Sequence, residues 1–155
     1  IRPKGDKTHA LLFLDLDNFK ELNDSLGHMA GDVALIDAAD ALRRIFRNVD
    51  AVGRFGGDEF CVFAMGITRN AVAARAESVL KALAMHFDRE GKAVNISASI
   101  GIYMFDGSEN SYEESLQRAD NAQYRAKQLG KNRYVFYDDP PVEHPESEQG
   151  QPSNA

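Results

Sequence analysis

The chain has 155 residues, enough for one domain with a sizeable buried core. Its net charge of −6 excludes a bulk nucleic-acid binder, because such proteins are basic. Residues 138–155 hold five acidic side chains and no Lys or Arg, which leaves 19 acidic and 18 basic side chains in the rest of the chain. Any phosphate binding must therefore come from local geometry.

The single cysteine, Cys61, excludes an internal disulfide and stands in an apolar run, where it is expected to be a small buried hydrophobe. No apolar stretch approaches the roughly 18 residues of a membrane-spanning helix, and no signal peptide is visible. We therefore expect a cytoplasmic domain without membrane insertion of its own. A membrane anchor elsewhere in a longer parent protein is compatible with this.

The first part of the chain predicts a strand and two helices. Residues 8–16 form a short apolar run that is typical of a buried strand. Asn18 with Glu21 resembles a helix N-cap and its capping box, which predicts a short helix to about Gly27. A longer helix is expected after Gly31-Asp32. Its apolar positions recur every three or four residues and would form one buried face, at Leu35, Ile36, Ala39, Leu42, Ile45 and Phe46.

A β-hairpin is predicted in the middle of the chain. Residues 51–55 and 59–65 favour strands, and Gly56-Gly57 between them can adopt positive φ at the turn. Residues 70–87 predict a second long helix from their Ala, Val and Leu at helical spacing. Residues 93–105 contain a long strand, in which apolar residues alternate with more polar ones at Val94, Ile96, Ala98, Ile100 and Ile102.

The last helix has clear end signals. Residues 111–114 form a capping box for a helix that runs to Leu129, and Gly130 ends it. Residues 134–137 predict the final strand. Residues 138–155, acidic and proline-rich, are expected to be disordered. Residues 1–137 thus predict one α+β domain, with helices around a mixed or mostly antiparallel sheet.

Two acidic segments attract attention. Asp15 ends an apolar strand, where a carboxylate is costly unless it meets a cation or a donor. Asp58-Glu59 lies at the hairpin tip. If the two strands are neighbours, Asp15 and Asp58 converge and suit Mg²⁺, which takes one or two protein carboxylates and completes its shell with phosphate and water. Either acid alone is more simply a strand-end or turn residue; together they favour a metal site.

Nucleotide-binding candidates surround the first acid. The helix beginning at Asn18 has unpaired amides that suit an anion, and Lys20 adds a positive charge, although a lone lysine is commonly a solvated surface residue. Asn23 and Asp32 can read guanine, because a carboxylate accepts from its N–H donors and an amide both donates and accepts. Asp32 could equally be a cap of the second helix, and Asn23 could be a polar residue on the face of the first.

Arg47 and Asp50 stand between the second helix and the hairpin. Arginine can pair bidentately with guanine or with phosphate. From the residues alone, a local surface pair of little energetic value is the simpler interpretation.

Four segments follow one another in a specific order: residues 15–32 (DLDNFKELNDSLGHMAGD), Gly56–Phe60 (GGDEF), residues 96–101 (ISASIG) and residues 119–133. Together they closely resemble the GGDEF family of diguanylate cyclases, over about residues 8–137. The resemblance implies an enzyme that condenses two GTP into cyclic di-GMP and two pyrophosphates. It also implies a nucleotidyl-cyclase or polymerase-palm-like sheet with GGDEF on a β-hairpin.

The resemblance implies roles for single residues. Two Mg²⁺ ions, with Mn²⁺ as a substitute, would be held by Asp15, the Leu16 carbonyl and Asp58. Asp58, or Glu59 beside it, would assist removal of the attacking hydroxyl proton. The triphosphate would contact Asn18, Phe19, Lys20, Lys127 and Lys131. Guanine would contact Asn23, His28, Asp32 and Leu35.

The resemblance also implies regulation and assembly. In the family an Arg-x-x-Asp pair before the signature forms an inhibitory product site, and Arg47 and Asp50 occupy that place, so we expect feedback inhibition by cyclic di-GMP. Catalysis would need a homodimer, because each domain carries one GTP. A sensory domain would precede this one in the parent protein. The family's N-terminal Asp-x-Leu-Thr segment is not found before residue 8, so we expect an open guanine pocket and weak activity.

Two alternatives stay open. The first is a non-catalytic domain that senses GTP or cyclic di-GMP, against which the intact acidic cluster argues. The second is a cyclase that acts on one nucleotide, against which Asn23, Asp32 and the complete signature argue.

Overall fold

The computed structural model describes residues 9–47, 50–108 and 111–140. Its strands form one six-stranded sheet, with β6 beside β5 and the other five in the order β2-β3-β1-β5-β4. In chain order the elements are β1 (His9–Asp17), α1 (Phe19–Leu26), α2 (His28–Ile45), β2 (Ala51–Arg54), β3 (Glu59–Ala64), α3 (Arg69–Ala82), β4 (Met85–Arg89), β5 (Lys92–Phe105), α4 (Tyr112–Gln128) and β6 (Arg133–Phe136).

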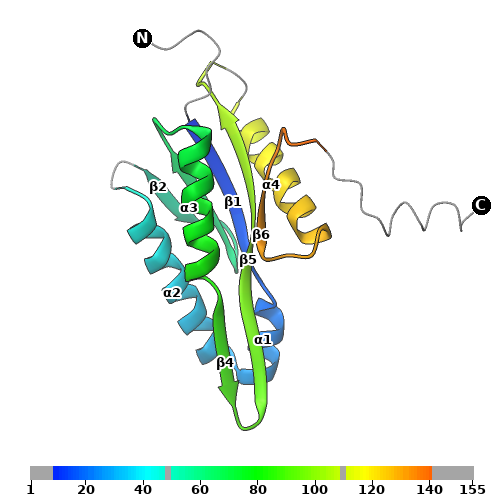
Figure 1. Ribbon diagram of the computed structural model, residues 1–155. Helices are drawn as coiled ribbons and strands as arrows, with labels where there is room; N and C mark the ends of the chain where they lie inside the picture. Colours follow the sequence, from blue (N-terminus) through cyan, green and yellow to red (C-terminus); the bar gives the residue numbers. More distant parts are fainter. Residues whose placement is uncertain (1–8, 48–49, 109–110, 141–155) are drawn as a thin grey trace, which may run out of the picture.

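Strand β1 lies at the centre of the sheet, antiparallel to β3 on one side and to β5 on the other (Figure 1). The hairpin strands β2 and β3 are antiparallel, as are β4 and β5, whereas β6 runs parallel to β5. The β4–β5 hairpin extends past the rest of the sheet, next to α1 (Figure 1). The predicted α+β architecture with a mostly antiparallel sheet is confirmed.

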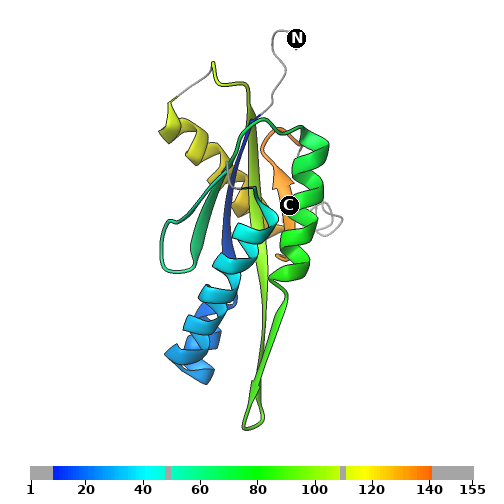
Figure 2. The same ribbon diagram turned by 90° about the vertical axis from the view of Figure 1, so that its left-hand side faces the viewer.

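Helices cover both faces of the sheet, and Figure 2 shows α3 and α4 on opposite sides of it. Side chains of a strand alternate between faces. Leu12, Leu14 and Leu16 of β1 therefore join the larger core beneath α1, α2 and α3. Leu11 and Phe13 face the smaller core beneath α4. The same alternation places the last two acids of β1, at positions 15 and 17, on the α4 side.

The structure corrects the predicted start of the first helix. Asn18 precedes α1 with a left-handed φ of 68°, and its side chain makes no capping hydrogen bond. Its Nδ2 instead donates to the Asn95 carbonyl oxygen at 3.0 Å, so the amide is committed to β5. Helix α2 begins at His28, earlier than expected, because Gly27 with φ of 94° already ends α1.

Two further predictions are wrong. The hairpin forms, but neither Gly56 nor Gly57 has a positive φ, so its turn does not use the left-handed region. The predicted helix over 70–87 ends at Ala82. Met85–Arg89 forms β4 instead, whose Met85 and Phe87 pack against the larger core. This short strand carries its own alternating pattern, which the preceding helical period concealed.

The end signals of α4 are confirmed. The Ser111 hydroxyl accepts from the Glu114 amide at 3.2 Å, and Gly130 follows the helix with φ of 122°. After β6, Asp138 and Asp139 both pair with Arg69, at 2.8 and 2.6 Å, so the first residues of the predicted tail contact α3. Residues 141–155 of that tail lie outside the described residues. Among the described helices, none has the length and apolar character needed to cross a membrane.

Candidate active site

The end of β1 and the hairpin turn bring Asp15 and Asp58 together. Asp15 stands opposite Glu59 in the β1–β3 register, and the Leu16 amide donates to the Asp58 carbonyl oxygen at 3.1 Å. Burial raises the pKa of Asp15, the Lys127 ammonium opposes that rise, and the nearby Asp58 and Asp17 carboxylates add to it. The predicted convergence of the two acids is therefore present.

Lys127, from the last turn of α4, neutralises this acidic group. Its Nζ lies 2.5 Å from Asp15 Oδ2. Burial opposes the charge of Lys127, yet the hydrogen bond and attraction to Asp15 raise its pKa above the usual value. The other carboxylate oxygen, Asp15 Oδ1, is buried and has no hydrogen-bond partner.

These residues fit a divalent cation only in part. Within the described residues no group of three or more His, Cys, Asp and Glu side chains could hold a metal ion by itself. Mg²⁺ commonly takes one or two protein carboxylates and completes its shell with phosphate and water. The unpartnered Oδ1 of Asp15 beside Asp58 is consistent with such a shared site.

Arg54 holds the turn that carries the acids. Its Nε donates to the Gly56 and Gly57 carbonyl oxygens at 3.2 and 3.1 Å, and its Nη2 donates to Gly57 at 2.7 Å. A Cβ on Gly56 would lie 2.5 Å from Glu59 Oε1, so the glycine leaves room for that carboxylate. No role was predicted for Arg54, although an arginine two residues before a Gly-Gly turn was the available signal.

The predicted phosphate contacts gather at the β1–α1 junction. Asn18 Oδ1 accepts from Lys131 Nζ at 3.5 Å, which joins the segment after α4 to the start of α1. Lys20 is exposed and pairs with Asp24 at 2.8 Å, one turn along α1. Phe19 is half-buried and its side chain packs against the larger core.

The predicted guanine contacts lie where α1 meets α2. Asn23 Oδ1 is buried without a hydrogen-bond partner. It sits 1.9 Å from the place that a Cβ on Gly31 would take, so the two helices touch through this glycine. Asp32 and His28 are exposed on α2, and Leu35 is 9% exposed.

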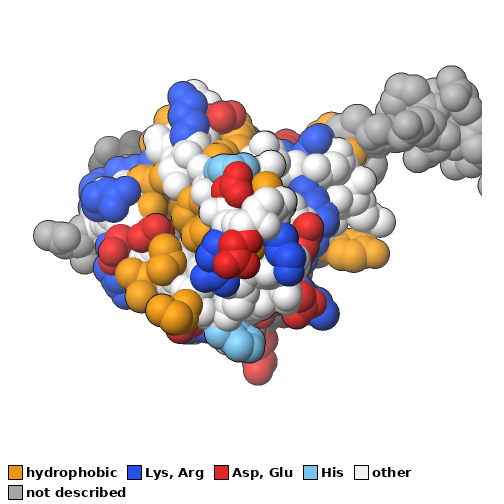
Figure 3. Space-filling model, turned by 90° about the horizontal axis from the view of Figure 1, so that it is seen from below, with side chains coloured by type: hydrophobic (Ala, Val, Ile, Leu, Met, Phe, Trp, Pro, Cys, Tyr) orange, Lys and Arg blue, Asp and Glu red, His pale blue; other side chains and the backbone are white. Residues whose placement is uncertain are grey.

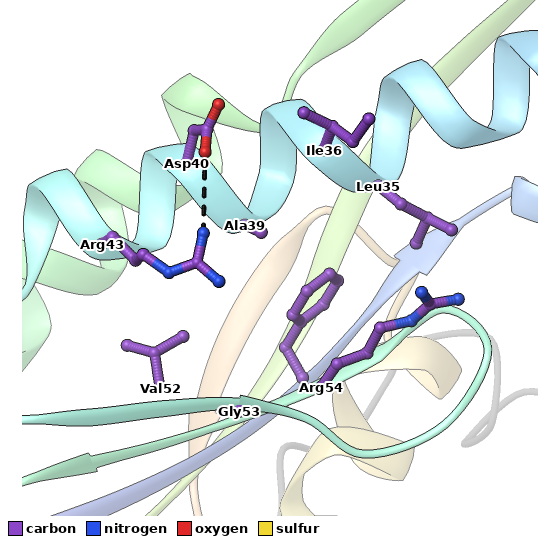
Figure 4. Close-up of a pocket in the computed structure, with 9 residues that line it drawn as sticks. Leu35, Ile36, Ala39, Asp40, Arg43, Val52, Gly53 and Arg54 are labelled. Carbon is purple, nitrogen blue, oxygen red and sulfur yellow. Dashed lines mark ion pairs between the residues drawn. The ribbon is translucent and has the colours of Figure 1, made fainter.

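An open groove of about 290 Å³ runs between α2 and β2, beside Leu35 (Figure 4). Figure 4 shows Leu35 and Ile36 above it and Arg54 below it. The exposed side of α2 carries three apolar side chains as well, Met29, Val33 and Ile36, among charged ones. Seen from the β4–β5 end of the molecule, hydrophobic side chains gather on one side of a surface of mixed charge (Figure 3).

Arg47 and Asp50 are close but have different surroundings. The Asp50 side chain is fully buried and accepts from the Arg47 and Met65 amides, at 3.0 and 3.2 Å, and from Arg75 at 3.3 Å. The Arg47 side chain is 49% exposed, and its Nη2 donates to the Met65 carbonyl oxygen at 3.1 Å. Of this predicted pair, Arg47 is the member that a ligand can reach.

Asp17 is a further buried acid for which the sequence predicted no role. Its carboxylate is buried and accepts three hydrogen bonds, from Ser97, Ser99 and the Asn132 amide. The signal was its position two residues after Asp15, on the same face of an apolar strand.

Comparison with known proteins decides the family of this site. The family model described as "Diguanylate cyclase, GGDEF domain" matches residues 2–133. The chain belongs to this GGDEF domain family. A bifunctional diguanylate cyclase/cyclic di-GMP phosphodiesterase, MucR of Pseudomonas aeruginosa, is 38% identical over 87% of this chain and 20% of its own length. Diguanylate cyclase A of Treponema denticola is 36% identical over 88% of this chain and 38% of its own.

Solved GGDEF domains have the same fold. The GGDEF domain of DgcB from Caulobacter crescentus, in complex with c-di-GMP, superposes with a TM-score of 0.78 at 28% identity. That match covers 86% of this chain and 80% of the other. The chain spans only about a fifth to two fifths of the two curated relatives, which are longer proteins.

Proposed function

We propose that this domain condenses two GTP into cyclic di-GMP and two pyrophosphates, with a divalent metal at Asp15 and Asp58. Two buried oxygens without a hydrogen-bond partner carry the proposal. Asp15 Oδ1 lies at the expected metal end of the site, and Asn23 Oδ1 lies at its expected guanine end. An unpaired buried acceptor costs about 1–3 kcal/mol, so a ligand that supplies a cation and a donor accounts for both.

The metal ligands would be Asp15, Asp58 and the Leu16 carbonyl oxygen, around two Mg²⁺ or Mn²⁺ ions. When bound, such ions stabilise the attacking and leaving oxygens of an in-line displacement at phosphorus. Without them, Lys127 balances the buried charge of Asp15 through its ion pair. The same ammonium can turn to the triphosphate once the acid has another cation.

The triphosphate would lie over the β1–α1 junction. The backbone amides of Asn18 and Phe19 suit it, because the first amides of a helix are unpaired and favour anions. Lys131, whose Nζ lies near Asn18, would add a positive charge. Lys20 would add another, since its exposed pair with Asp24 contributes little energy and is easily exchanged for phosphate.

Guanine would lie between α1 and α2. Asn23 Oδ1 would accept from the guanine N–H donors, and Asp32 would accept from the same edge of the base. Leu35 would contact the ring plane, and His28 would stand at the rim of the pocket. The groove between α2 and β2 opens beside Leu35, which supports a pocket open on that side.

The reaction would need two domains that face each other as a homodimer. The 3′-hydroxyl of one GTP attacks the α-phosphorus of the other, the new P–O bond forms and pyrophosphate leaves. Asp58, or Glu59 beside it, accepts the hydroxyl proton. The reciprocal attack closes the ring. Alignment of two bound substrates can supply up to about 7–11 kcal/mol of the barrier reduction.

Cyclic di-GMP would also inhibit the domain, at the surface around Arg47. The exposed Arg47 guanidinium supports this, because arginine can pair bidentately with guanine or phosphate. The c-di-GMP complex of the similar DgcB domain gives further support. We also propose a cytoplasmic location and a sensory domain ahead of this one in a longer protein. The matched relatives extend well beyond the matched region, which supports a further domain.

Incubation of the purified domain with GTP and Mg²⁺, followed by ion-exchange chromatography, tests the activity. The proposal predicts cyclic di-GMP and pyrophosphate in a 1:2 ratio. GTP that is bound but recovered unchanged would favour the non-catalytic sensing domain, and a cyclic mononucleotide would favour the one-nucleotide cyclase.

A further inference from the structure

We propose that Asp17 is a positioning residue, which holds the segment after α4 in the conformation that presents Lys131 to the substrate phosphates. The inference rests on the proposed function. It concerns how this chain orients a phosphate contact through a residue that does not touch substrate.

The Asp17 carboxylate is enclosed by three donors. It is 3% exposed. Ser99 Oγ donates to Oδ1 at 2.7 Å, and Ser97 Oγ donates to Oδ2 at 2.6 Å. The Asn132 amide donates to the same Oδ2 at 3.1 Å. Asp17 therefore joins the end of β1 to β5 and to the segment that follows α4.

That segment has an unusual backbone. Gly130, Lys131 and Asn132 have φ of 122°, 65° and 51°. Residues other than glycine rarely adopt this region, and two in succession persist only when neighbouring groups fix them. The Lys131 amide donates to the Ala126 carbonyl oxygen at 3.0 Å, and the next amide, that of Asn132, donates to Asp17. Two successive amides, that of Lys131 and that of Asn132, are thus fixed by hydrogen bonds, one to a backbone carbonyl oxygen and one to the Asp17 carboxylate.

The result is a defined direction for the Lys131 side chain. Its Nζ lies 3.5 Å from Asn18 Oδ1, over the β1–α1 junction where the phosphates are expected. Asp17 is only one residue before Asn18, so the same short stretch of chain fixes both the lysine and its neighbour. Loss of the Asn132 hydrogen bond would let the segment leave the left-handed region and move the ammonium away.

A role for Asp17 as a further metal ligand is less consistent with its contacts. Both carboxylate oxygens already accept hydrogen bonds from donors on β5 and after α4. Asp15 Oδ1, by contrast, has no partner. The two acids therefore share a face of β1 but differ in what they can bind.

A double-mutant cycle tests the inference, with binding of a non-hydrolysable GTP analogue and Mg²⁺ as the measurement. Asp17→Ala should weaken binding about tenfold, since a hydrogen bond to a charged group is lost. Asp17→Asn should restore it to within about threefold, because its oxygen still accepts from Asn132 and its NH₂ can donate to Ser99. Ser99→Ala, which leaves the Asn132 bond intact, is the matched control and should behave like Asp17→Asn.

Lys131→Ala decides between positioning and general stabilisation. In a Lys131→Ala background, Asp17→Ala should cause less than about twofold further loss, because the group that it positions is gone. Equal losses in both backgrounds would overturn the inference and leave the proposed function intact. Wild-type protein that binds no GTP analogue would instead refute the proposed function.

Hydrogen exchange at the Asn132 amide gives a readout without substrate. The amide should be protected in the wild type and in Asp17→Asn, and should exchange rapidly in Asp17→Ala. If Asp17→Ala does not fold, amide exchange in the wild type and in Asp17→Asn still tests the inference. An Asn132 amide that exchanges in either of them as fast as an exposed loop amide overturns the inference.

Discussion

Asn23 Oδ1 lies 1.9 Å from the position that a Cβ of Gly31 would occupy, so the absence of a side chain on α2 sets the place of an amide on α1. The neighbouring elements explain the close approach, because Gly27 turns the chain sharply between these two helices. The unpartnered Asn23 oxygen is thereby held where α1 meets α2, against the residue that precedes Asp32, the second proposed guanine contact.

Gly31→Ala should weaken GTP binding about tenfold without unfolding the domain. The methyl group meets the end of the Asn23 side chain, which must turn away and lose a hydrogen bond to guanine, and it lies 3.3 Å from Phe19 Cζ, which must shift slightly. Alanine is the better helix former by up to about 1 kcal/mol, so the thermal midpoint should stay level or rise. Calorimetric titration of GTP and ATP measures the change. In an Asn23→Ala background the same substitution should have little effect, and an undiminished effect there would contradict this explanation.

Arg47→Ala should relieve inhibition by cyclic di-GMP while leaving the fold stable. Its side chain is half-exposed, and its hydrogen bond is to a single carbonyl oxygen. Initial rates of pyrophosphate release at increasing cyclic di-GMP concentrations measure the inhibition. An unchanged inhibition curve would remove Arg47 from the product site.

Asp50→Ala should destabilise the fold far more than Arg47→Ala does. The variant leaves the Arg47 and Met65 amides and the Arg75 guanidinium without their common acceptor. Breaking a buried ion pair on one side typically costs about 3–5 kcal/mol. We therefore expect urea unfolding to show a large loss for Asp50→Ala and a loss below about 1 kcal/mol for Arg47→Ala. Similar losses for both would show that Asp50 is not the buried anchor of this loop.

Cys61 should react slowly with thiol reagents. Burial raises the pKa of its thiol to about 11 from an ordinary value of 9.0. Two pKa units correspond to roughly hundredfold less thiolate near pH 8, so the native protein should react about a hundredfold more slowly than the unfolded one. Absorbance on reaction with an aromatic disulfide in buffer and in urea compares the two rates.

The same shift has a consequence for stability. Between pH 9 and 11 the folded state retains the Cys61 proton that the unfolded state loses, so stability should fall as pH rises through this window. Cys61→Ala should remove that part of the fall. An identical pH dependence in the variant would mean that the thiol does not contribute.

Local sequence patterns were sufficient for much of the fold. Ser111 and Gly130 mark the ends of α4 because a cap and a left-handed stop act within one helical turn. The strand ending at Asp15 was predictable because its apolar run is short and bounded by polar residues.

Other features depend on partners far along the chain. The Asn18 side chain does not cap α1 and instead donates to the Asn95 carbonyl oxygen. The Asp17 carboxylate accepts from Ser97 and Ser99. No local pattern shows which residues of β5 stand opposite them. From the sequence, Asp50 likewise resembled a surface partner of Arg47. In the structure its carboxylate is buried and accepts from Arg75 of α3, a contact 25 residues along the chain that no local pattern predicts. The candidate site residues were predicted from residue type, order and the family resemblance, whereas their supporting contacts required the structure.

Synthesis of cyclic di-GMP by wild type and Asp58→Ala tests the central claim most directly. Both proteins are incubated with GTP and Mg²⁺, with Asp88→Ala, at the distant β4–β5 hairpin, as the control. The account predicts Mg²⁺-dependent product from the wild type and the control, and no detectable product from a folded Asp58→Ala protein. Undiminished synthesis by Asp58→Ala would contradict a metal site shared by Asp15 and Asp58.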